Sequence, residues 1–386
     1  MHPNGPHAMR LAAAGLVAVL ALPAIAQSLQ QSGTMRWVVV ASRQNLDEAI
    51  GIAKTYEDAK VVQSVNGWYG VVTGPRAVTN QAALKNQLVK DENFPKDLVF
   101  SKGDNYTALV WQSRRIEPSR SVALEGEPGT KTMTAGGLTV TLTTLKDKEG
   151  EHTPVVTGMI GGRTVFTARL DDGKSEAPRA EAKLYRLDPA SPQPQVMITA
   201  YTGGAHCCTV TQIATADAAG NWKVLEGGTL DGGAYAVEDA DGDGVPELTH
   251  RDNSFLYAFA SYAGSVAPMR IKRVFAGTLA DVTREPRYQP YLRQEVAGIE
   301  HLTVRYGPGE ANGYYAGWVA AKALIGEVEA AWPVMLQRQD RNPPMKPQKC
   351  SVNRKLEECP QDKLVDIPFP EALRAHLSAG GYPVPR

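Results

Sequence analysis

Four acidic residues stand in one glycine-containing stretch of the chain, at the first, third, fifth and ninth positions. Carboxylates at this spacing, with a backbone carbonyl at the seventh position, form an oxygen cage of the kind that calcium prefers. The expected ligands are Asp239, Asp241, Asp243, Val245 and Glu247. An EF-hand needs an acid at the twelfth position, where His250 stands, so an EF-hand is disfavoured. The pattern predicts a structural calcium site, with a solvated acidic turn as the alternative.

The order Asp-x-Asp-x-Asp-Gly-x-x-acid in this stretch resembles the strand-joining calcium loop of FG-GAP and VCBS-type β-propeller repeats. The resemblance implies that the loop joins two strands and that calcium stabilises the surrounding β domain. Those loops occur in series, whereas this chain carries one copy. The resemblance therefore covers the loop and not a complete propeller.

The four cysteines are grouped two by two along the sequence: Cys207 is next to Cys208, and Cys350 is close to Cys359. An even number of cysteines in an exported chain predicts disulfide bonds. Four cysteines allow three pairings, and Cys350–Cys359 is the local one. Cys207 and Cys208 either bond to each other, or one of them reaches the C-terminal pair.

Cys207 and Cys208 follow His206, which raises other interpretations of this segment. The first is a zinc or copper site, the second a cysteine nucleophile with His206 as its base, and the third a pair of free buried thiols. Neighbours in a strand face opposite sides of a sheet, so they do not easily share a metal or a reactive partner. Disulfide use is therefore the favoured interpretation.

The first 26 residues have the pattern of a cleaved signal peptide. Arg10 precedes an uncharged apolar run, Leu11–Leu22, which ends near the small residues Ala24 and Ala26. The run is shorter than the 20 or so residues that a membrane span needs, although an uncleaved membrane anchor is the alternative. The later sequence contains no apolar stretch of that length, so no membrane span is expected after cleavage. We therefore expect a protein exported to the periplasm of a bacterial cell envelope.

Composition and spacing indicate several domains. The chain has 386 residues and equal numbers of basic and acidic residues, 41 each, which argues against a nucleic acid partner. The expected order is a signal peptide (1–26), a first domain (35–112), a linker (113–135), a β-rich domain (136–305) and a helical C-terminal region (306–386). Proline and glycine punctuation marks the linker, and short strands, including one at 255–259, are expected in the β-rich domain.

The first domain is expected to follow the order β-α-β-β-α-β. Asn45 and Thr79 are expected to cap its two helices, and Asn66-Gly67 predicts a tight hairpin between the second and third strands. The last strand is expected in 98–101 or 107–111. Two β-α-β halves of this kind close into a ferredoxin-like sheet with both helices on one face.

The opening strand, Trp37-Val38-Val39-Val40-Ala41-Ser42, and the third, Tyr69-Gly70-Val71-Val72-Thr73-Gly74-Pro75, resemble those of the SPOR domain family. Members of that family bind peptidoglycan in bacterial envelopes, and the resemblance covers about 75 residues. It implies a glycan-binding face on the sheet that carries Trp37, Val39, Trp68, Gly70 and Val72. The family usually places Gln and Arg on this face, where this chain has Val39, Gly70 and Val72.

Two tryptophans could replace those polar groups, because strand residues alternate between the faces of a sheet. Trp37 and Trp68 are expected to face outward from neighbouring strands. Large rings suit the apolar faces of sugars and keep an N–H group for hydrogen bonding. The alternative is that both rings are buried against the linker or the second domain, or serve a protein-binding role.

These patterns predict an α+β protein with a ferredoxin-like SPOR-type domain, a mainly antiparallel β domain and a short helical C-terminal region. The sequence contains no Gly-x-Ser-x-Gly elbow, His-Glu-x-x-His helix or phosphate-binding loop. The expected function is therefore a non-catalytic envelope protein that binds peptidoglycan, with calcium as a structural cofactor. The alternatives are a peptidoglycan-active or other envelope hydrolase, and an adaptor that binds envelope proteins.

Overall fold

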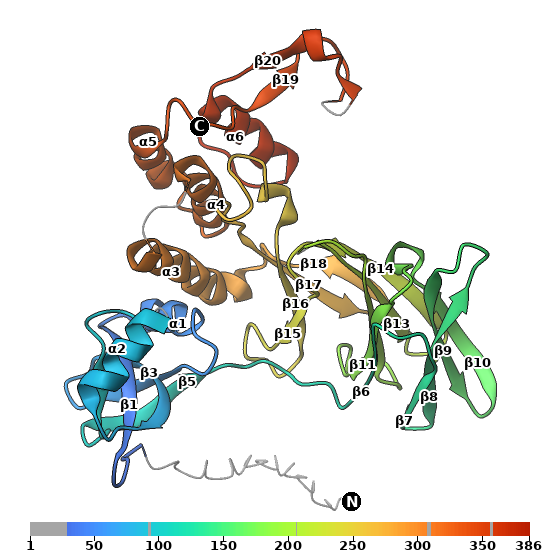
Figure 1. Cartoon of the computed structure of the whole chain (residues 1–386), viewed down its shortest axis with the longest axis horizontal. Coiled ribbons are helices and arrows are strands. Elements are labelled where there is room, and N and C mark those ends of the chain that lie inside the picture. The colour runs from blue at the N-terminus through green and yellow to red at the C-terminus, as the bar shows by residue number, and fades with distance from the viewer. Residues whose placement is uncertain (1–28, 92–93, 206, 307–309, 356–357) are drawn as a thin grey trace, which may run out of the picture.

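The computed structural model describes residues 29–91, 94–205, 207–306, 310–355 and 358–386. The expected signal peptide, 1–26, lies outside the described residues. Within them the chain is an α+β protein built from antiparallel sheets, with a short helical region at its C-terminal end (Figure 1). No helix in these ranges is both long and apolar enough to cross a membrane.

The first part, here called the N-terminal unit, is a five-stranded sheet with two helices on one face. Its elements are β1 (Met35–Arg43), α1 (Leu46–Ala53), β2 (Lys60–Ser64), β3 (Tyr69–Ala77), α2 (Gln81–Asp91), β4 (Val99–Ser101) and β5 (Tyr106–Gln112). The sheet order is β4-β1-β3-β2-β5. The expected β-α-β-β-α-β order is present. Both segments considered for the last strand form strands: β4 pairs with β1, and β5 adds to the other edge of the sheet beside β2.

Short-range hydrogen bonds fix the turns of this unit. The Asn45 side chain accepts a hydrogen bond from the Glu48 N–H and caps α1, as expected. Asn80, and not Thr79, accepts from Ala83 N–H at the start of α2. In the hairpin between β2 and β3, Gly67 has φ +81°, a conformation that glycine adopts without steric cost.

The second part is a β-sandwich. Its strands are β6 (Arg120–Glu125), β7 (Lys131–Ala135), β8 (Leu138–Lys146), β9 (His152–Ile160), β10 (Arg163–Arg169), β11 (Arg179–Tyr185), β12 (Gln195–Tyr201), β13 (Thr209–Ala216) and β14 (Trp222–Leu230). A β10-β9-β8-β7 sheet packs on a β14-β13-β12-β11-β6 sheet around one apolar core. The segment expected as a linker, 113–135, thus contains β6 and β7. Its Leu124 and Met133 side chains are buried in that core, and the prolines and glycines lie between strands.

A smaller sheet, here called the central sheet, lies between the sandwich and the helices. It contains β15 (Ala236–Glu238), β16 (Glu247–Arg251), β17 (Met269–Phe275) and β18 (Thr278–Asp281). Val237, Leu248 and Val274 pack against the outer face of the sandwich. The strand expected at 255–259 is absent: Asn253–Phe255 is a 3₁₀ turn capped by Asp252, which turns Phe255 into the core of the helical region.

The helical region contains α3 (Gln289–Tyr306), α4 (Ala311–Leu324), α5 (Val328–Arg338) and α6 (Phe369–Ala379). A small hairpin of β19 (Gln348–Cys350) and β20 (Leu364–Asp366) projects from it, at the top of Figure 1. The region begins with α3, earlier than the expected boundary at 306. Its core includes Ile271 of the central sheet, so the helices and that sheet form one packed body.

The N-terminal unit packs on the helical region where α1 crosses α3. Gly51 of α1 and Gly298 of α3 face each other at this crossing. A Cβ atom added to Gly51 would lie 2.2 Å from the Gln294 carbonyl oxygen, and one added to Gly298 would lie 2.9 Å from the Gly51 carbonyl oxygen. The two helices therefore approach each other at backbone distance, which only glycine permits here.

This crossing gives the first testable prediction, for Gly51→Ala. Alanine is normally the better residue inside a helix, by about 0.5–1 kcal/mol. Here we expect the opposite sign, because overpacking against a backbone costs about 1–3 kcal/mol. Thermal and denaturant unfolding of the full chain measure the change. Gly129→Ala is the matched control, since its added Cβ would meet its nearest atom at 3.8 Å. A Gly51→Ala protein as stable as the wild type would contradict the close crossing.

Candidate functional site

A cavity of about 430 Å³ lies where three parts of the molecule meet. The N-terminal unit contributes the end of α1, the start of the α1–β2 connection and Trp111 of β5. The central sheet and the turn before it contribute a second wall, and α3 contributes the third. The cavity is in the size range that proteins use for small ligands, so we treat it as the candidate functional site, here called the junction cavity.

Glu295 of α3 is the most strongly held charge in this cavity. Its side chain is 7% exposed, and its carboxylate lies 3.1 Å from Lys54 Nζ and 2.9 Å from a terminal nitrogen of Arg251. Burial alone raises the pKa of Glu295, but the charges and hydrogen bonds of Lys54 and Arg251 outweigh burial and leave it below its usual value. Because Lys54 caps the C-terminal end of α1 and Arg251 ends β16, one carboxylate joins all three walls.

A second acid of the cavity, the half-buried Glu238, has its hydrogen bonds supplied by neutral groups. One of its oxygens accepts from the Tyr291 hydroxyl at 2.5 Å and from the Thr249 hydroxyl at 2.6 Å. Burial first, and then the Glu295 and Glu238 charges, raise the pKa of Tyr291 well above its usual value. Tyr291 therefore stays a neutral phenol at neutral pH and donates its hydroxyl hydrogen to Glu238.

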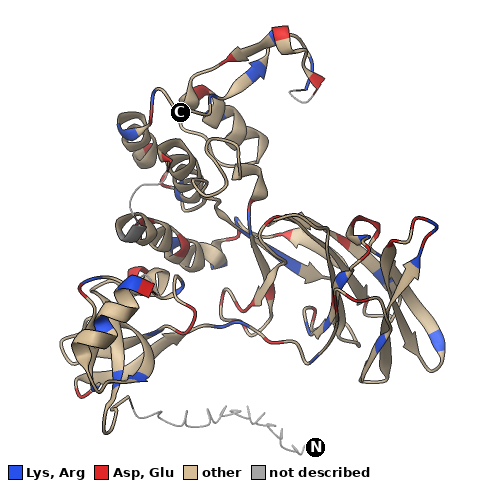
Figure 2. Ribbon diagram, viewed as in Figure 1, with Lys and Arg blue, Asp and Glu red and all other residues tan. Residues whose placement is uncertain are grey.

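The remaining lining combines one large aromatic ring with small and polar groups. Trp111 is half-buried in the wall, and Gly232 and Gly233 form part of the rim. The charged lining residues nearly balance: Lys54, Arg115 and Arg251 against Glu57, Asp231, Glu238 and Glu295. Figure 2 shows the same mixture of signs over the described residues. A ring beside many hydrogen-bonding groups and little net charge suits an uncharged, hydroxyl-rich ligand.

His250 also lines this cavity, three residues after Glu247 at the end of the acidic stretch. Its ring packs edge-on against Tyr235, with the ring centres 5.0 Å apart. Burial lowers the pKa of His250, so the ring is neutral at pH 7. It therefore adds no charge to the cavity.

The acidic stretch forms the loop between β15 and β16, as expected for a strand-joining loop. Carboxylate oxygens of Asp239, Asp241 and Glu247 lie within 4.8 Å of one another. The Asp239 carboxylate also accepts hydrogen bonds from the Gly242 and Gly244 N–H groups, which close the turn. Three of the expected ligands are thus brought together.

Two arginines reach several of these acids. The Asp243 carboxylate lies 3.3 Å from Arg273 and 3.8 Å from Arg287, and it accepts from the Val245 N–H at 2.7 Å. Arg287 also lies 3.6 Å from Asp241, and Arg273 lies 3.8 Å from Glu247. Glu247 is fully buried and accepts from the Tyr288 hydroxyl and the Ala240 N–H. Burial raises its pKa to about 7, against the lowering effect of those two hydrogen bonds. An oxygen-only donor set with a buried carboxylate fits a hard cation.

The expected glycan face on the N-terminal unit is not an open surface. Trp37, Val39 and Val72 do lie on the face away from the helices, but they pack there with Leu29, Tyr106 and Leu109. Trp37 is 5% exposed, and its ring N–H donates to the Leu29 carbonyl at 2.7 Å. Gly70 is buried as well, and only Trp68, in the hairpin turn, is exposed, at 39%. The two rings therefore do not form a shared platform.

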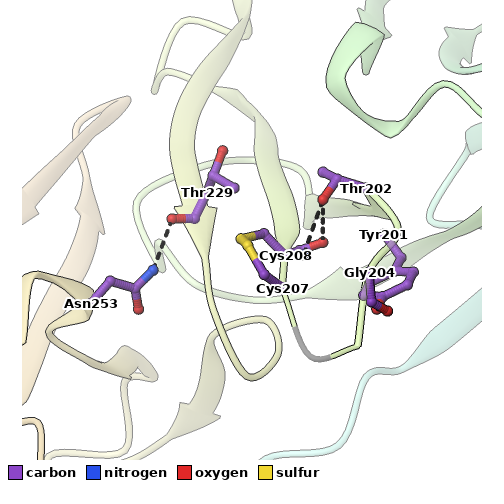
Figure 3. The surroundings of a disulfide bond; sticks show 7 residues. All are labelled: Tyr201, Thr202, Gly204, Cys207, Cys208, Thr229 and Asn253. Carbon is purple, nitrogen blue, oxygen red and sulfur yellow. Dashed lines mark hydrogen bonds between the residues drawn. A yellow bond between two sulfur atoms is a disulfide. The ribbon is translucent and has the colours of Figure 1, made fainter. Parts of the chain in front are cut away.

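Both cysteine pairs form disulfide bonds. Cys350 and Cys359 are linked with Cα atoms 5.7 Å apart, as the local pairing predicted. Cys207 and Cys208 bond to each other in the turn before β13, so both sulfurs lie on one side, near Asp231. Figure 3 shows this turn beside Thr202, whose hydroxyl bonds to the Cys208 backbone. His206 lies outside the described residues.

One arrangement outside the cavity resembles part of a hydrolytic site. Ser254 Oγ lies 3.2 Å from His376 Nε2, and it donates to Asp252 at 2.7 Å. Asp252 also accepts from Tyr382 and pairs with Arg270, so it caps the 3₁₀ turn and joins it to the C-terminal segment. A catalytic acid would contact the far nitrogen of the histidine ring, and not the serine. The cluster is therefore better explained as structural.

The fold and the cavity define a multi-part α+β protein whose candidate site lies at the junction of its parts. A family model described as the sll0997 C-terminal domain matches residues 292–381, which run from within α3 to just past α6. The uncharacterized protein y4bJ of Sinorhizobium fredii is 36% identical over 383 residues, 97% of this chain and 60% of that protein. The chain thus spans less than two thirds of the length of y4bJ.

The probable thylakoid lumen protein sll0997 of Synechocystis is 31% identical over 305 residues, 78% of this chain and 87% of that protein. The chain therefore belongs to the family of sll0997. No solved structure matches the chain.

These comparisons correct the assignment made from sequence resemblance. They find no SPOR domain; the matching family model and both relatives point to the sll0997 family instead, and no propeller repeat accompanies the acidic loop. The strand motifs at 37–42 and 69–75 are explained by the βαββαβ arrangement itself, which unrelated families share.

Sequence reasoning did not select Lys54, Arg251, Glu295 or Trp111. Lys54 and Glu295 are 241 residues apart, and no local spacing connects them. A lysine at the end of one helix and a glutamate within another are ordinary surface residues until the helices pack together. The one available signal was a glycine within each helix, at 51 and 298, which marks close packing.

The buried carboxylate gives the second prediction, for Glu295→Gln. The variant leaves Lys54 and Arg251 without their shared anion, and we expect a loss of about 3 kcal/mol in the free energy of unfolding at pH 7. Because the folded-state pKa is lowered, the stabilisation by ionised Glu295 is complete above its unfolded pKa. It is lost as the pH falls through the lower, folded value.

The wild-type and Glu295→Gln melting temperatures should therefore converge as the pH is lowered from 7 towards 3. Glu176→Gln, at an exposed position of the sandwich, is the control and should show no such trend. A gap between wild type and variant that stays constant with pH would show that the Glu295 charge is not what joins the three walls.

Proposed function

We propose that this chain is an exported, non-catalytic binding protein that takes a glycan into the junction cavity. The observation that carries the proposal is the placement of the Trp111 ring in a concave, nearly charge-balanced site rich in hydrogen-bonding groups. Sugars present an apolar ring face and a rim of hydroxyls, and this combination matches both kinds of lining. Peptidoglycan glycan is the proposed ligand.

Two observations support export. The cysteines form disulfide bonds, which persist in oxidising compartments. The relative sll0997 is named as a probable thylakoid lumen protein, and a lumen is reached by export from the compartment of synthesis. A periplasmic location is the specific form of this proposal, with envelope proteins as further partners.

The protonation behaviour of the cavity favours binding over catalysis. A general acid or base works best with a pKa near the working pH. The pKa of Glu295 is shifted down and that of Tyr291 is shifted up, so each is held in one protonation state at neutral pH. A hydrolase acting through these groups is therefore the weaker candidate.

The third prediction tests the cavity as the binding site. Titration calorimetry of the full chain with a soluble peptidoglycan disaccharide should show binding, and Trp111→Ala should weaken it about tenfold or more, as loss of an aromatic anchor does. Trp111→Phe, which keeps a ring, should restore most of the affinity. Trp68→Ala is the control, because that exposed ring lies in the hairpin turn and outside the cavity lining.

Circular dichroism at the assay temperature checks that each tryptophan variant is folded. If Trp111→Ala binds as tightly as the wild type, the cavity is not the glycan site. Release of soluble reducing sugar from cell-wall sacculi by the wild type would instead support the hydrolase alternative.

We also propose that the β15–β16 loop holds calcium in a structural role. Asp239, Asp241 and Glu247 supply three converging carboxylates, and the Val245 carbonyl is the expected fourth donor. A bound cation would neutralise the repulsion among these acids and fix the register of β16. Asp243 stays part of the proposal, although Arg273 and Arg287 already compensate its charge.

The fourth prediction is that millimolar calcium raises the melting temperature and that EDTA reverses the change. With a dissociation constant of about 10⁻⁴ M, ten times that concentration of calcium stabilises by about 1.4 kcal/mol. Asp239→Asn combined with Asp241→Asn should remove the response. Asp217→Asn, in another aspartate turn, should keep it. A calcium response of equal size in the double variant would place the effect outside this loop.

A further inference from the structure

A second cavity, of about 500 Å³, adjoins the junction cavity. Its floor is the outer face of the sandwich strands β6, β11 and β12, and its side wall is the segment that enters β15. Three tyrosines line it: Tyr185, Tyr201 and Tyr235. Here it is called the sandwich cavity.

The two cavities share a boundary, here called the ridge, formed by Arg115, Ala234 and Ala236, which line both of them. Ala234 is small and exposed, and the Arg115 side chain is 72% exposed. Each cavity alone has the room of one small ligand. A ligand that fills both must therefore be elongated and must cross the ridge at Ala234.

The sandwich cavity contains arginine side chains that no buried salt bridge holds. Lys183 is paired with Glu181 at 2.6 Å. Arg179 is exposed, and it makes no salt bridge within the described ranges of the chain. Arg115 has one exposed partner, Glu117, at 3.8 Å, and such exposed pairs hold their partners weakly. Two guanidinium groups are thus available to carboxylates at the ridge and beyond it.

From this geometry we infer that the ligand is an oligosaccharide of several units that carries carboxylate groups, and that it runs from the junction cavity across Ala234 into the sandwich cavity. This inference rests on the proposed glycan-binding function and specifies the ligand. The sugar beside Trp111 is held by stacking and neutral hydrogen bonds. Units beyond the ridge lie among the tyrosines, with their carboxylates at Arg115 and Arg179.

The experiment compares ligand lengths on the full chain by titration calorimetry. The probes are peptidoglycan glycan fragments of two, four and six sugars, whose lactyl groups supply carboxylates. Chitin oligomers of the same lengths serve as uncharged comparators. We expect affinity for the acidic series to rise at least tenfold from two to six sugars, and the neutral series to rise less.

Two variants locate the effect. Arg179→Gln should weaken binding of the acidic hexamer about fivefold, which is the upper range for one exposed ion pair, and should leave both disaccharides unchanged. Ala234→Trp should block the ridge and remove the length dependence in both series. Arg163→Gln, an exposed arginine on β10 at the far side of the sandwich, is the matched control and should change nothing.

The outcomes separate this inference from the proposed function. If the disaccharide binds but longer fragments bind no tighter, the elongated ligand is wrong and the junction cavity remains the glycan site. If affinity rises with length and neither Arg179→Gln nor Ala234→Trp alters it, the ligand leaves the junction cavity by another path, and the inference is overturned. If no fragment of any length binds, both the inference and the proposed function fail.

Discussion

The crossing of α1 and α3 and the buried carboxylate beside it hold the molecule in its observed arrangement. Gly51 and Gly298 let the two backbones meet, and this places Lys54 within reach of Glu295. An unpaired carboxylate at this depth would cost several kcal/mol, so the arrangement is stable only when Lys54 and Arg251 both reach it. Lys54 and Arg251 come from different parts of the chain, and the junction cavity lies between those parts.

This constraint also explains the chemistry of the junction cavity. Its buried charges form salt bridges with one another. The lining therefore presents polar groups that already have hydrogen-bond partners, one aromatic ring and little net charge. The pairing lowers the pKa of Glu295, so this carboxylate stays ionised at neutral pH and is a weak proton acceptor. The same pairing that joins the parts is the basis for proposing a site that binds rather than one that reacts. Arg115 on the ridge and Arg179 in the sandwich cavity lie outside that network.

The corrected family assignment illustrates how a local resemblance can be satisfied by geometry alone. Residues of each strand in a βαββαβ unit alternate between the two faces of the sheet. Units of different function therefore carry similar short strand motifs. The face that was expected to bind glycan carries Trp37 and Val72, but residues before β1 and in β5 cover it. Whether a sheet face is open depends on those covering segments and not on the strand that carries the motif.

The sequence by itself determined features that depend on residues close together in the chain. These are the Asn45 cap, the Asn66–Gly67 turn, the Cys350–Cys359 bond and the acidic loop between two strands. Only the tertiary structure decided the burial of Trp37 and the meeting of Lys54, Arg251 and Glu295. The physical reason is that burial and charge pairing are set by which surfaces pack together. Residues 241 positions apart carry no local pattern that records this contact.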